Sequence, residues 1–277
     1  MHVLLTGGSG TVGTAITDHL ADDPDYSFTN LDVRGTDDPN VEDVTADARY
    51  YDEIRPHFEG VDAVVHLAYA KNYRKSRAEE RVVWSHAHLG NLQANAAVFR
   101  GAIAADVDTV VYASSNHAVG AYEDRHAPAL YDPDYDLTLD HTVQPAPDSM
   151  YGAMKVYGET LGRLAAEYHD TSVYAWRIAR VDDPDRDTPA DHAAAAIDAG
   201  TDPESESFRR DMARKQAMWF SRRDCAHMLA CFLEDDTVDF DVFYGVSDNE
   251  SRWFDIDHAR EVVGYEPEDD GSSWDVP

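Results

Sequence analysis

The sequence predicts an α/β fold in which helices cover both faces of a parallel sheet, and three observations lead to it. Short apolar runs alternate along the chain with segments of helical periodicity. The later apolar runs are continuous, as is typical of strands buried on both faces. The first run leads into a glycine-rich turn and then at once into a helical pattern. Strands and helices that alternate in this way form βαβ units with right-handed crossovers, and therefore a doubly wound parallel sheet.

The glycine-rich turn follows the apolar run 3–6 and precedes a helical pattern that starts near Ala15. Glycines at 7, 10 and 13 allow a sharp turn without Cβ clashes, bring backbone N–H groups against a pyrophosphate and pack the helix closely on the strand. This pattern is typical of the dinucleotide-binding turn of a Rossmann-type fold. The residues that it is expected to contribute to the cofactor site are Gly7, Gly10, Thr11, Val12 and Gly13.

The second strand gives an independent indication of the cofactor. Residues 27–32 form a short β pattern that ends in Asp32, nineteen residues after Gly13. A carboxylate about 20 residues beyond the turn typically binds the adenosine ribose hydroxyls of NAD. A solvated loop aspartate is the alternative, and Arg34 nearby would suit the extra phosphate of NADP. Asp47, at the end of the stretch over 41–47, is expected beside the adenine.

The chain then continues the alternation of helices and strands. We expect a helix over about 50–58, a strand over 61–68, a helix over 76–105 and a strand over 109–113. Ligands of doubly wound sheets bind beyond the carboxyl ends of the strands. Ser115, Asn116 and His117 follow the strand over 109–113, so chemistry is expected at these residues.

A helix over about 150–168 follows a loop rich in Pro and Asp at about 123–149, and it carries Tyr151 and Lys155. These two residues are four apart, so their side chains share one face of the helix. A lysine cation beside a phenol favours the phenolate, and a bound oxidised nicotinamide adds to this effect. The pair therefore predicts a general base for a substrate hydroxyl, held in place by Ser115.

The charge balance limits the partners of the protein. The chain has 277 residues, with 54 Asp and Glu against 23 Lys and Arg, a formal net charge of −31 and a pI near 4.5. Nucleic acids and anionic membranes need a positive surface, so neither is an expected partner. Acid spread along the whole chain is typical of a cytoplasmic protein in the high-salt cytosol of a halophile, and an acidic mesophilic protein is the alternative. No charged and apolar leader follows Met1, and no apolar run approaches the ~18 residues of a membrane span.

Neither the cysteines nor the histidines indicate a metal site. Cys225 and Cys231, the only cysteines, fall on different faces of a helix expected over about 222–234, and both are predicted to be buried free thiols. The thirteen histidines show no metal-ligand spacing. We therefore expect no bound metal.

Taken in this order, the motifs resemble the extended short-chain dehydrogenase/reductases of the NAD-dependent epimerase/dehydratase family. The resemblance covers about the first 180 residues and depends on the glycine turn, Asp32, His66-Leu67-Ala68, Asn91, Ser115, Tyr151 and Lys155. It implies that Ser115 and Tyr151 hold the reacting oxygen. It also implies that Lys155 holds the nicotinamide ribose, that Asn91 supports a proton relay, and that Leu67-Ala68 belongs to the cofactor site.

Finer motifs resemble the uronate dehydrogenase subgroup and its haloarchaeal glucose-6-phosphate dehydrogenase relatives. They lie at residues 113–122, 216–225 and 244–249. The resemblance implies that Asn116 and His117 face a sugar, that Arg214 holds its anionic group, and that a hydride passes from C1 of the sugar to the nicotinamide, giving a lactone. The alternatives are a structural role for His117 in its loop and a surface salt bridge for Arg214.

The chain departs from that subgroup at two places. Ala179-Arg180 stands where the subgroup has a glycine and a small or polar residue, and a basic stretch that starts at Lys71 replaces a less basic loop. If Lys71 and Arg180 reach the pocket, they predict a more anionic substrate than a uronate, such as a sugar phosphate. The alternative is that both residues only pair with the surplus carboxylates.

We expect two parts in the chain: an NAD-binding Rossmann-type domain over residues 1–180 and a small substrate-binding lobe over residues 181–277. An acidic insertion at about 182–207 surrounds a short helix at 192–199, and we interpret it as a solvated loop, with a mobile lid as the alternative. A strand at 242–244 and a helix near 255–263 follow. The family resemblance implies a homodimer in which the helices over 76–105 and 150–168 form a four-helix bundle.

Two other functions stay open beside a sugar dehydrogenase. A sugar epimerase or dehydratase would use the same cofactor without net turnover of it. A non-catalytic NAD-binding protein would keep the fold and lose the chemistry, but such a protein has no physical need for Ser115, Tyr151 and Lys155 together. Stoichiometric release of NADH would separate the dehydrogenase from both.

Overall fold

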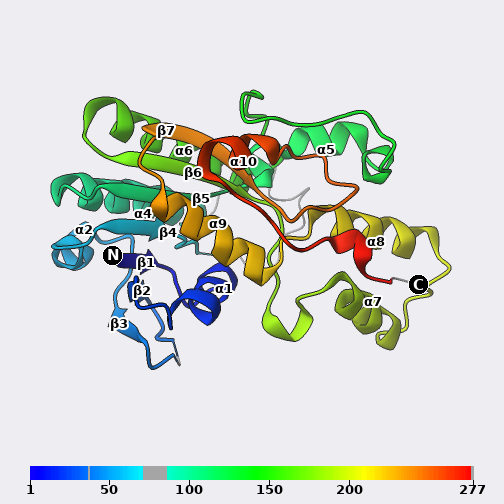
Figure 1. Cartoon of the computed structure of the whole chain (residues 1–277), viewed down its shortest axis with the longest axis horizontal. Helices are drawn as coiled ribbons and strands as arrows, with labels where there is room; N and C mark the ends of the chain where they lie inside the picture. The colour runs from blue at the N-terminus through cyan, green and yellow to red at the C-terminus, as the bar shows by residue number, and fades with distance from the viewer. Residues whose placement is uncertain (37, 71–85, 276–277) are drawn as a thin grey trace.

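The fold is organised around one seven-stranded sheet (Figure 1). The structure, a computed structural model, describes residues 1–36, 38–70 and 86–275. The strands are β1 (His2–Thr6), β2 (Ser27–Asp32), β3 (Val41–Thr45), β4 (Ala63–His66), β5 (Thr109–Ser115), β6 (Ser172–Ile178) and β7 (Phe240–Gly245). Their order is β3-β2-β1-β4-β5-β6-β7 and every neighbouring pair is parallel. The predicted doubly wound parallel sheet is confirmed.

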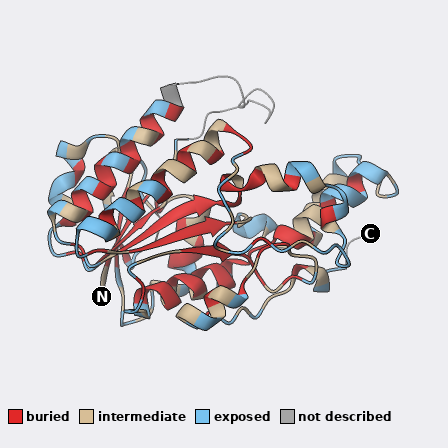
Figure 2. Cartoon of the chain, turned by 90° about the horizontal axis from the view of Figure 1, so that it is seen from above, coloured by how far each residue is buried: buried red, intermediate tan, exposed pale blue. Residues whose placement is uncertain are grey.

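Helices lie on both sides of this sheet, and Figure 2 shows the strands as a buried layer between them. The helices are α1 (Thr11–Leu20), α2 (Tyr51–Ile54), α4 (His86–Ala104), α5 (Gly120–His126), α6 (Met150–Tyr168), α7 (Pro189–Asp198), α8 (Glu206–Met218), α9 (Arg222–Glu234) and α10 (Asp257–Val263). α1 packs against α9, and α4 packs against α6. Successive strand residues point to opposite faces, so Leu4 and Val64 belong to one apolar core, while Val3 and Val65 belong to the other.

The strand order reverses beside β1, since β2 lies on one side of it and β4 on the other. The connections after these strands leave the sheet in opposite directions at such a point, which opens a crevice at the carboxyl ends. The turn after β1 and the residues after β4 therefore meet there, in the place where doubly wound sheets bind their ligands.

The chain returns to the sheet after residue 180. β7 pairs with β6 along its whole length, and α9 covers the same face as α1. Phe232 and Phe243 pack with Trp176 in one core, so this part of the chain shares the apolar interior of the nucleotide-binding half. α5, α7 and α8, with the short segments around them, extend beyond the sheet (Figure 1).

The stretch over 182–207 is more regular than the solvated loop that we expected. Its helix, α7, begins at Pro189 rather than at 192, because Thr188 and Asp191 form a reciprocal capping box and proline suits the first turn. Ala193 packs with Phe208 and Met212 of α8 in a small separate core. α8 itself was not among the expected helices.

The other expected elements lie close to their predicted positions. The helix expected over 50–58 is α2 followed by a 3₁₀ segment, Arg55–Phe58, where Pro56 removes a backbone donor. Of the helix expected over 76–105, the structure describes residues 86–104 as α4. Cys225 and Cys231 are buried free thiols, as predicted. No helix in the described part of the chain is long and apolar enough to span a membrane.

Candidate active site

The turn between β1 and α1 packs so closely against neighbouring backbone that it requires glycine. Gly7 has a φ of +79°, and a Cβ there would lie 2.6 Å from the Ala68 Cα. A Cβ on Gly13 would lie 2.1 Å from the backbone oxygen of Gly8. α1 begins after Gly10, which gives it no side-chain cap. The first N–H groups of the helix, including those of Thr11 and Val12, thus face the crevice in the arrangement that binds pyrophosphate.

Asp32 lies at the end of β2 beside this turn. Its two carboxylate oxygens accept hydrogen bonds from the backbone N–H groups of Ser9 and Arg34, each at 3.2 Å. The carboxylate is therefore oriented where a ribose hydroxyl would approach, and these residues fit NAD. The Arg34 side chain is exposed. Asp47 is bound by Arg49 at 2.9 Å, and this contact lowers the pKa of the carboxyl, so a role of Asp47 beside the adenine stays a prediction.

The segment after β4 closes over the glycine turn, since Leu67 donates its N–H to the Thr6 carbonyl at 2.9 Å and Ala68 touches Gly7. Asn91, 3% exposed on α4, holds this segment. Its amide oxygen accepts from the Ala70 N–H at 2.8 Å, and its amide nitrogen donates to the Ala70 carbonyl at 3.1 Å. Both polar atoms of the Asn91 amide are thus hydrogen-bonded to the backbone of Ala70, so Asn91 positions this segment. A part of Asn91 in a proton relay stays a prediction.

The end of β5 and the 3₁₀ segment Asn116–Ala118 place three polar residues together. Ser115 Oγ accepts the His117 N–H and donates to Asn116 Oδ1, both at 3.3 Å. His117 Nδ1 lies 2.7 Å from Oδ2 of Asp148, whose side chain is fully buried. The carboxylate accepts a hydrogen bond from the Nδ1–H, so the Nε2 of a neutral His117 is an acceptor. Sequence reasoning missed Asp148, which lies just before the helix of Tyr151.

The first turn of α6 packs directly on this 3₁₀ segment. Ser149 caps the helix by accepting the Gly152 N–H, and a Cβ on Gly152 would lie 2.2 Å from the His117 carbonyl oxygen. This packing sets the ring of Tyr151 edge-on to His117, with centroids 5.3 Å apart. Lys155 Nζ lies 5.6 Å from the Tyr151 ring centroid and donates to the Ala113 carbonyl at 2.6 Å. The structure thus brings the predicted Tyr151, Lys155 and His117 together.

Lys155 is a buried cation, and burial lowers its pKa to about 8, while Glu159 one turn further along α6 opposes this effect. Glu159 is itself buried in an ion pair with Arg177, with two N–O distances of 2.9 Å. Arg177 Nη1 donates to the Tyr244 hydroxyl at 3.1 Å. Sequence reasoning missed Glu159. The signal that could have identified it is its position four residues after Lys155, on the same face of the helix.

A second buried network lies around His66, and sequence reasoning, which named His66 only as part of a family motif, missed its partners. His66 accepts from Thr6 Oγ1 at Nδ1 (2.7 Å) and donates to Asn95 Oδ1 from Nε2 (3.0 Å). Burial, with a contribution from the Lys155 cation, lowers the pKa of His66 to about 3. His66 is therefore neutral and supports the floor of the site without adding a second charge.

The predicted substrate-binding basic residues are mostly engaged with carboxylates. Arg180 holds Asp182 through two hydrogen bonds, at 2.6 and 2.9 Å, and His192 joins the same carboxylate at 3.0 Å. Arg180 thus joins the end of β6 to α7, and its role toward a substrate stays a prediction. Lys71 lies outside the described residues.

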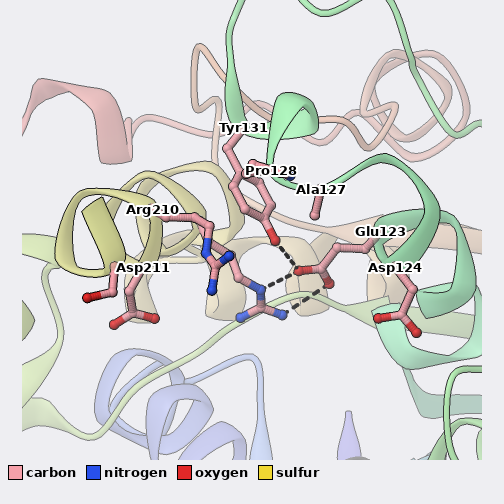
Figure 3. Close-up of a pocket in the computed structure, with 9 residues that line it drawn as sticks. Glu123, Asp124, Ala127, Pro128, Tyr131, Arg210 and Asp211 are labelled. Atoms are coloured by element: carbon pink, nitrogen blue, oxygen red, sulfur yellow. Dashed lines mark hydrogen bonds and ion pairs between the residues drawn. The ribbon is translucent and has the colours of Figure 1, made fainter. Parts of the chain in front are cut away.

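Arg214 lies in a pocket of about 330 Å³ between α5 and α8 (Figure 3). The described lining is Glu123, Asp124, Ala127, Pro128, Tyr131, Ser207, Arg210, Asp211 and Arg214. The Arg214 guanidinium is held bidentately by Glu123, which also accepts the Tyr131 hydroxyl at 2.8 Å. The side chain of Glu123 is 5% exposed and that of Arg214 is 22% exposed, so the carboxylate is buried and the guanidinium is partly exposed. Figure 3 shows Arg210 reaching into the same space from α8.

Known proteins with similar sequences cover nearly the whole chain. A chain from Haloferax volcanii, an NAD-dependent glucose-6-phosphate dehydrogenase, is 35% identical over 98% of this chain and 95% of its own length. An L-arabinose 1-dehydrogenase (NAD(P)(+)) from the same organism is 30% identical over 98% of each chain. A uronate dehydrogenase from Pseudomonas putida is 23% identical over 98% of this chain and 85% of its own.

Solved structures agree with the fold. The crystal structure of uronate dehydrogenase from Agrobacterium tumefaciens has a TM-score of 0.72 at 22% identity and covers 98% of this chain and 86% of its own. A mutant of that enzyme was solved as a complex with NAD. The model of the NAD dependent epimerase/dehydratase family matches residues 3–235. The chain therefore belongs to the NAD dependent epimerase/dehydratase family, as an enzyme of the extended short-chain dehydrogenase/reductase class.

Proposed function

We propose that the protein is an NAD-dependent dehydrogenase that oxidises the C1 hydroxyl of an anionic sugar, a hexose 6-phosphate or a uronate, to a lactone. The observation that carries this proposal is the position of Tyr151 beside the buried Lys155 and against His117, whose N–H is bound to Ser115 at the end of β5. The names of the relatives, which are sugar dehydrogenases, support the substrate class.

Each of these side chains has a distinct part in the proposed reaction. The Tyr151 phenolate takes the proton of the C1 hydroxyl, and the Lys155 cation stabilises the charge of that phenolate. Ser115 holds the same hydroxyl oxygen. The His117 ring, oriented by Asp148, accepts a hydrogen bond from a further sugar hydroxyl at Nε2. NAD, when bound, supplies the hydride acceptor, and the glycine turn with Asp32 would hold it.

The direct test is the appearance of reduced nicotinamide in molar KCl, with NAD or NADP and a panel of sugars. The panel contains glucose 6-phosphate, glucuronate, galacturonate and free aldoses including L-arabinose. Reduction with one of the anionic sugars supports the proposal. If no sugar reduces either cofactor although NAD still raises the melting temperature, the proposal fails. An epimerase or dehydratase, or a non-catalytic NAD-binding protein, would then explain the fold better.

The ion pair between Glu123 and Arg214 favours a second candidate function, in which the enzyme is a dehydrogenase of neutral sugars. Three carboxylates and two arginines line the described part of the pocket, so its net charge does not attract an anion. Glu123 already occupies the bidentate face of Arg214 that a carboxylate or phosphate would use. An anionic sugar must therefore displace Glu123, use the remaining Nη donors of Arg214 or bind Arg210, whereas a neutral pentose or hexose needs none of these.

The Glu123→Gln variant separates the two candidates, because it removes the competing charge with little change in shape. We expect the ratio of kcat/KM for glucose 6-phosphate to kcat/KM for glucose to rise at least about tenfold, equivalent to about 1.4 kcal/mol. The matched control is Asp211→Asn, which removes a carboxylate of the same pocket that pairs with Lys215 rather than with Arg214. An equal ratio in wild type and Glu123→Gln would show that Arg214 does not contact the substrate.

We also infer a homodimer and a place in a high-salt cytosol. α4 and α6 pack side by side, and their large apolar residues Leu89, Leu164 and Tyr168 are 57%, 54% and 73% exposed. Such a surface supports pairing with a second copy through a four-helix bundle. The net charge of −31 supports the high-salt cytosol, because molar salt screens self-repulsion. Light scattering in molar KCl would measure the mass of the assembly.

A further inference from the structure

We propose that His141, Asp241 and His258 form a binding site for one divalent transition metal ion, of the Zn²⁺ type, remote from the site of Tyr151. One ligand atom of each residue lies within 4.8 Å of the others. The three residues come from the loop after α5, from β7 and from α10. Two imidazoles and one carboxylate form a donor set that suits Zn²⁺, Co²⁺ or Ni²⁺ better than Mg²⁺ or Ca²⁺.

Backbone hydrogen bonds fix the segments that carry His141 and His258 relative to each other. The Leu139 N–H donates to the Trp253 carbonyl at 2.8 Å, and the Asp255 N–H donates to the Leu139 carbonyl at 3.0 Å. These bonds fix the loop that carries His141 against the segment that leads into α10 and His258. One oxygen of Asp241, Oδ1, accepts the Val242 N–H at 2.7 Å, which orients the other oxygen toward His258.

Ring stacking restricts the two histidines further. His258 is stacked on Phe243 at 5.3 Å with planes 16° apart, and on His141 at 3.5 Å with planes 12° apart. The rotamers of both imidazoles are therefore limited before any metal binds. Because an imidazole nitrogen binds a metal in the plane of its ring, His141 must turn out of this stack to share one ion with His258, while the packing on Phe243 can keep His258 in place.

Two observations point to a ligand rather than to packing alone. His141 Nδ1 is buried and has no hydrogen-bond partner among the described residues, which is costly for a ring nitrogen. His258 Nε2 and Asp241 Oδ2 are 2.8 Å apart, with one proton between them. Two ligand atoms of a tetrahedral Zn²⁺ are about 3.3 Å apart, so these two atoms must move about half an ångström further apart for the ion to replace the proton.

The site would stabilise the fold rather than take part in sugar oxidation. Asp241 is the second residue of β7, near its amino end, whereas the site of Ser115 and Tyr151 lies at the carboxyl ends of the strands. A bound ion would tie the edge strand of the sheet to α10 and to the preceding loop. Any ion that binds only the folded chain raises its melting temperature.

The test measures Zn²⁺ binding and thermal unfolding of the full chain in chelator-treated molar KCl. We expect one ion per chain by calorimetry, and at a hundredfold excess over Kd a melting temperature about 5–10 °C higher. Asp241→Asn, which keeps shape, and His258→Ala should each lose the ion and the shift. His169→Ala is the control for a surface histidine, because His169 is exposed at the end of α6.

Co²⁺ gives a second measurement that does not depend on the folding of a variant. The wild-type chain should develop the visible absorption of four-coordinate Co²⁺, and Zn²⁺ should displace it. Binding that survives in both Asp241→Asn and His258→Ala, or that is lost equally in His169→Ala, would show only adventitious ions on an acidic surface and would overturn the proposal. The same holds if the wild-type chain binds no stoichiometric ion.

Discussion

Replacing Tyr151 with phenylalanine is expected to lower kcat by about 10²–10⁴-fold, the range that a general base contributes. The reason is that phenylalanine keeps the ring that packs edge-on against Tyr69 and His117 but has no oxygen to take the C1 proton. Cofactor binding should be nearly unchanged, because the glycine turn and Asp32 lie on other elements. The measurements are steady-state kinetics on the best sugar of the panel and the NAD-induced rise in melting temperature.

The control for Tyr151→Phe is Tyr157→Phe, which makes the same change six positions further along α6. That variant should keep full activity, since Tyr157 follows Lys155 by two positions and therefore lies about 200° around the helix, on the opposite face. A Tyr151→Phe enzyme with a tenth or more of wild-type kcat would assign the proton to another group, and the proposed role of Tyr151 would be wrong.

Replacing Lys155 with methionine should have opposite effects on activity and stability. Activity should fall strongly, because the phenolate loses its neighbouring cation. The cofactor-free protein should become more stable at pH 7, because burial holds the pKa of Lys155 at about 8 instead of 10.5, a difference that corresponds to about 3 kcal/mol. Since methionine also gives up the 2.6 Å hydrogen bond to the Ala113 carbonyl, we expect a net gain of about 1–3 kcal/mol in the free energy of unfolding.

The pH dependence of this gain has a definite sign. Below pH 8 Lys155 is protonated in both the folded and the unfolded wild type, so the full cost of the buried charge is present. Between pH 8 and 10.5 the unfolded chain binds the proton and the folded chain does not, so the wild type gains stability as pH rises and the difference from Lys155→Met shrinks.

Denaturant unfolding of both proteins across this pH range measures the effect. Lys215→Met, which removes a lysine paired with Asp211 on α8, should give no such gain at pH 7. A Lys155→Met protein that is less stable than wild type at pH 7 would contradict a destabilising buried charge.

The sequence by itself determined the elements whose signal is local. The turn with Gly7, Gly10 and Gly13, the continuous apolar strands and the sharing of one helix face by Tyr151 and Lys155 all depend on residues within a few positions of one another. Local periodicity also placed Ser115 at the carboxyl end of a strand. The parallel sheet then follows from the alternation of elements, so the fold class and the placement of Tyr151 beside Lys155 were both predictable.

The tertiary structure alone decided which distant groups meet. Arg214 pairs with Glu123, ninety-one residues away, and β7, which belongs to the small lobe expected over 181–277, pairs with β6 in the main sheet. His141, Asp241 and His258 come together although their spacing shows no metal-ligand pattern. With 54 acidic residues against 23 basic ones, each arginine has many possible partners, and the sequence does not choose among them. The pairing is decided when the packing of helices and strands brings particular side chains within hydrogen-bond distance. This depends on contacts between segments that are distant in the sequence, not on local pattern.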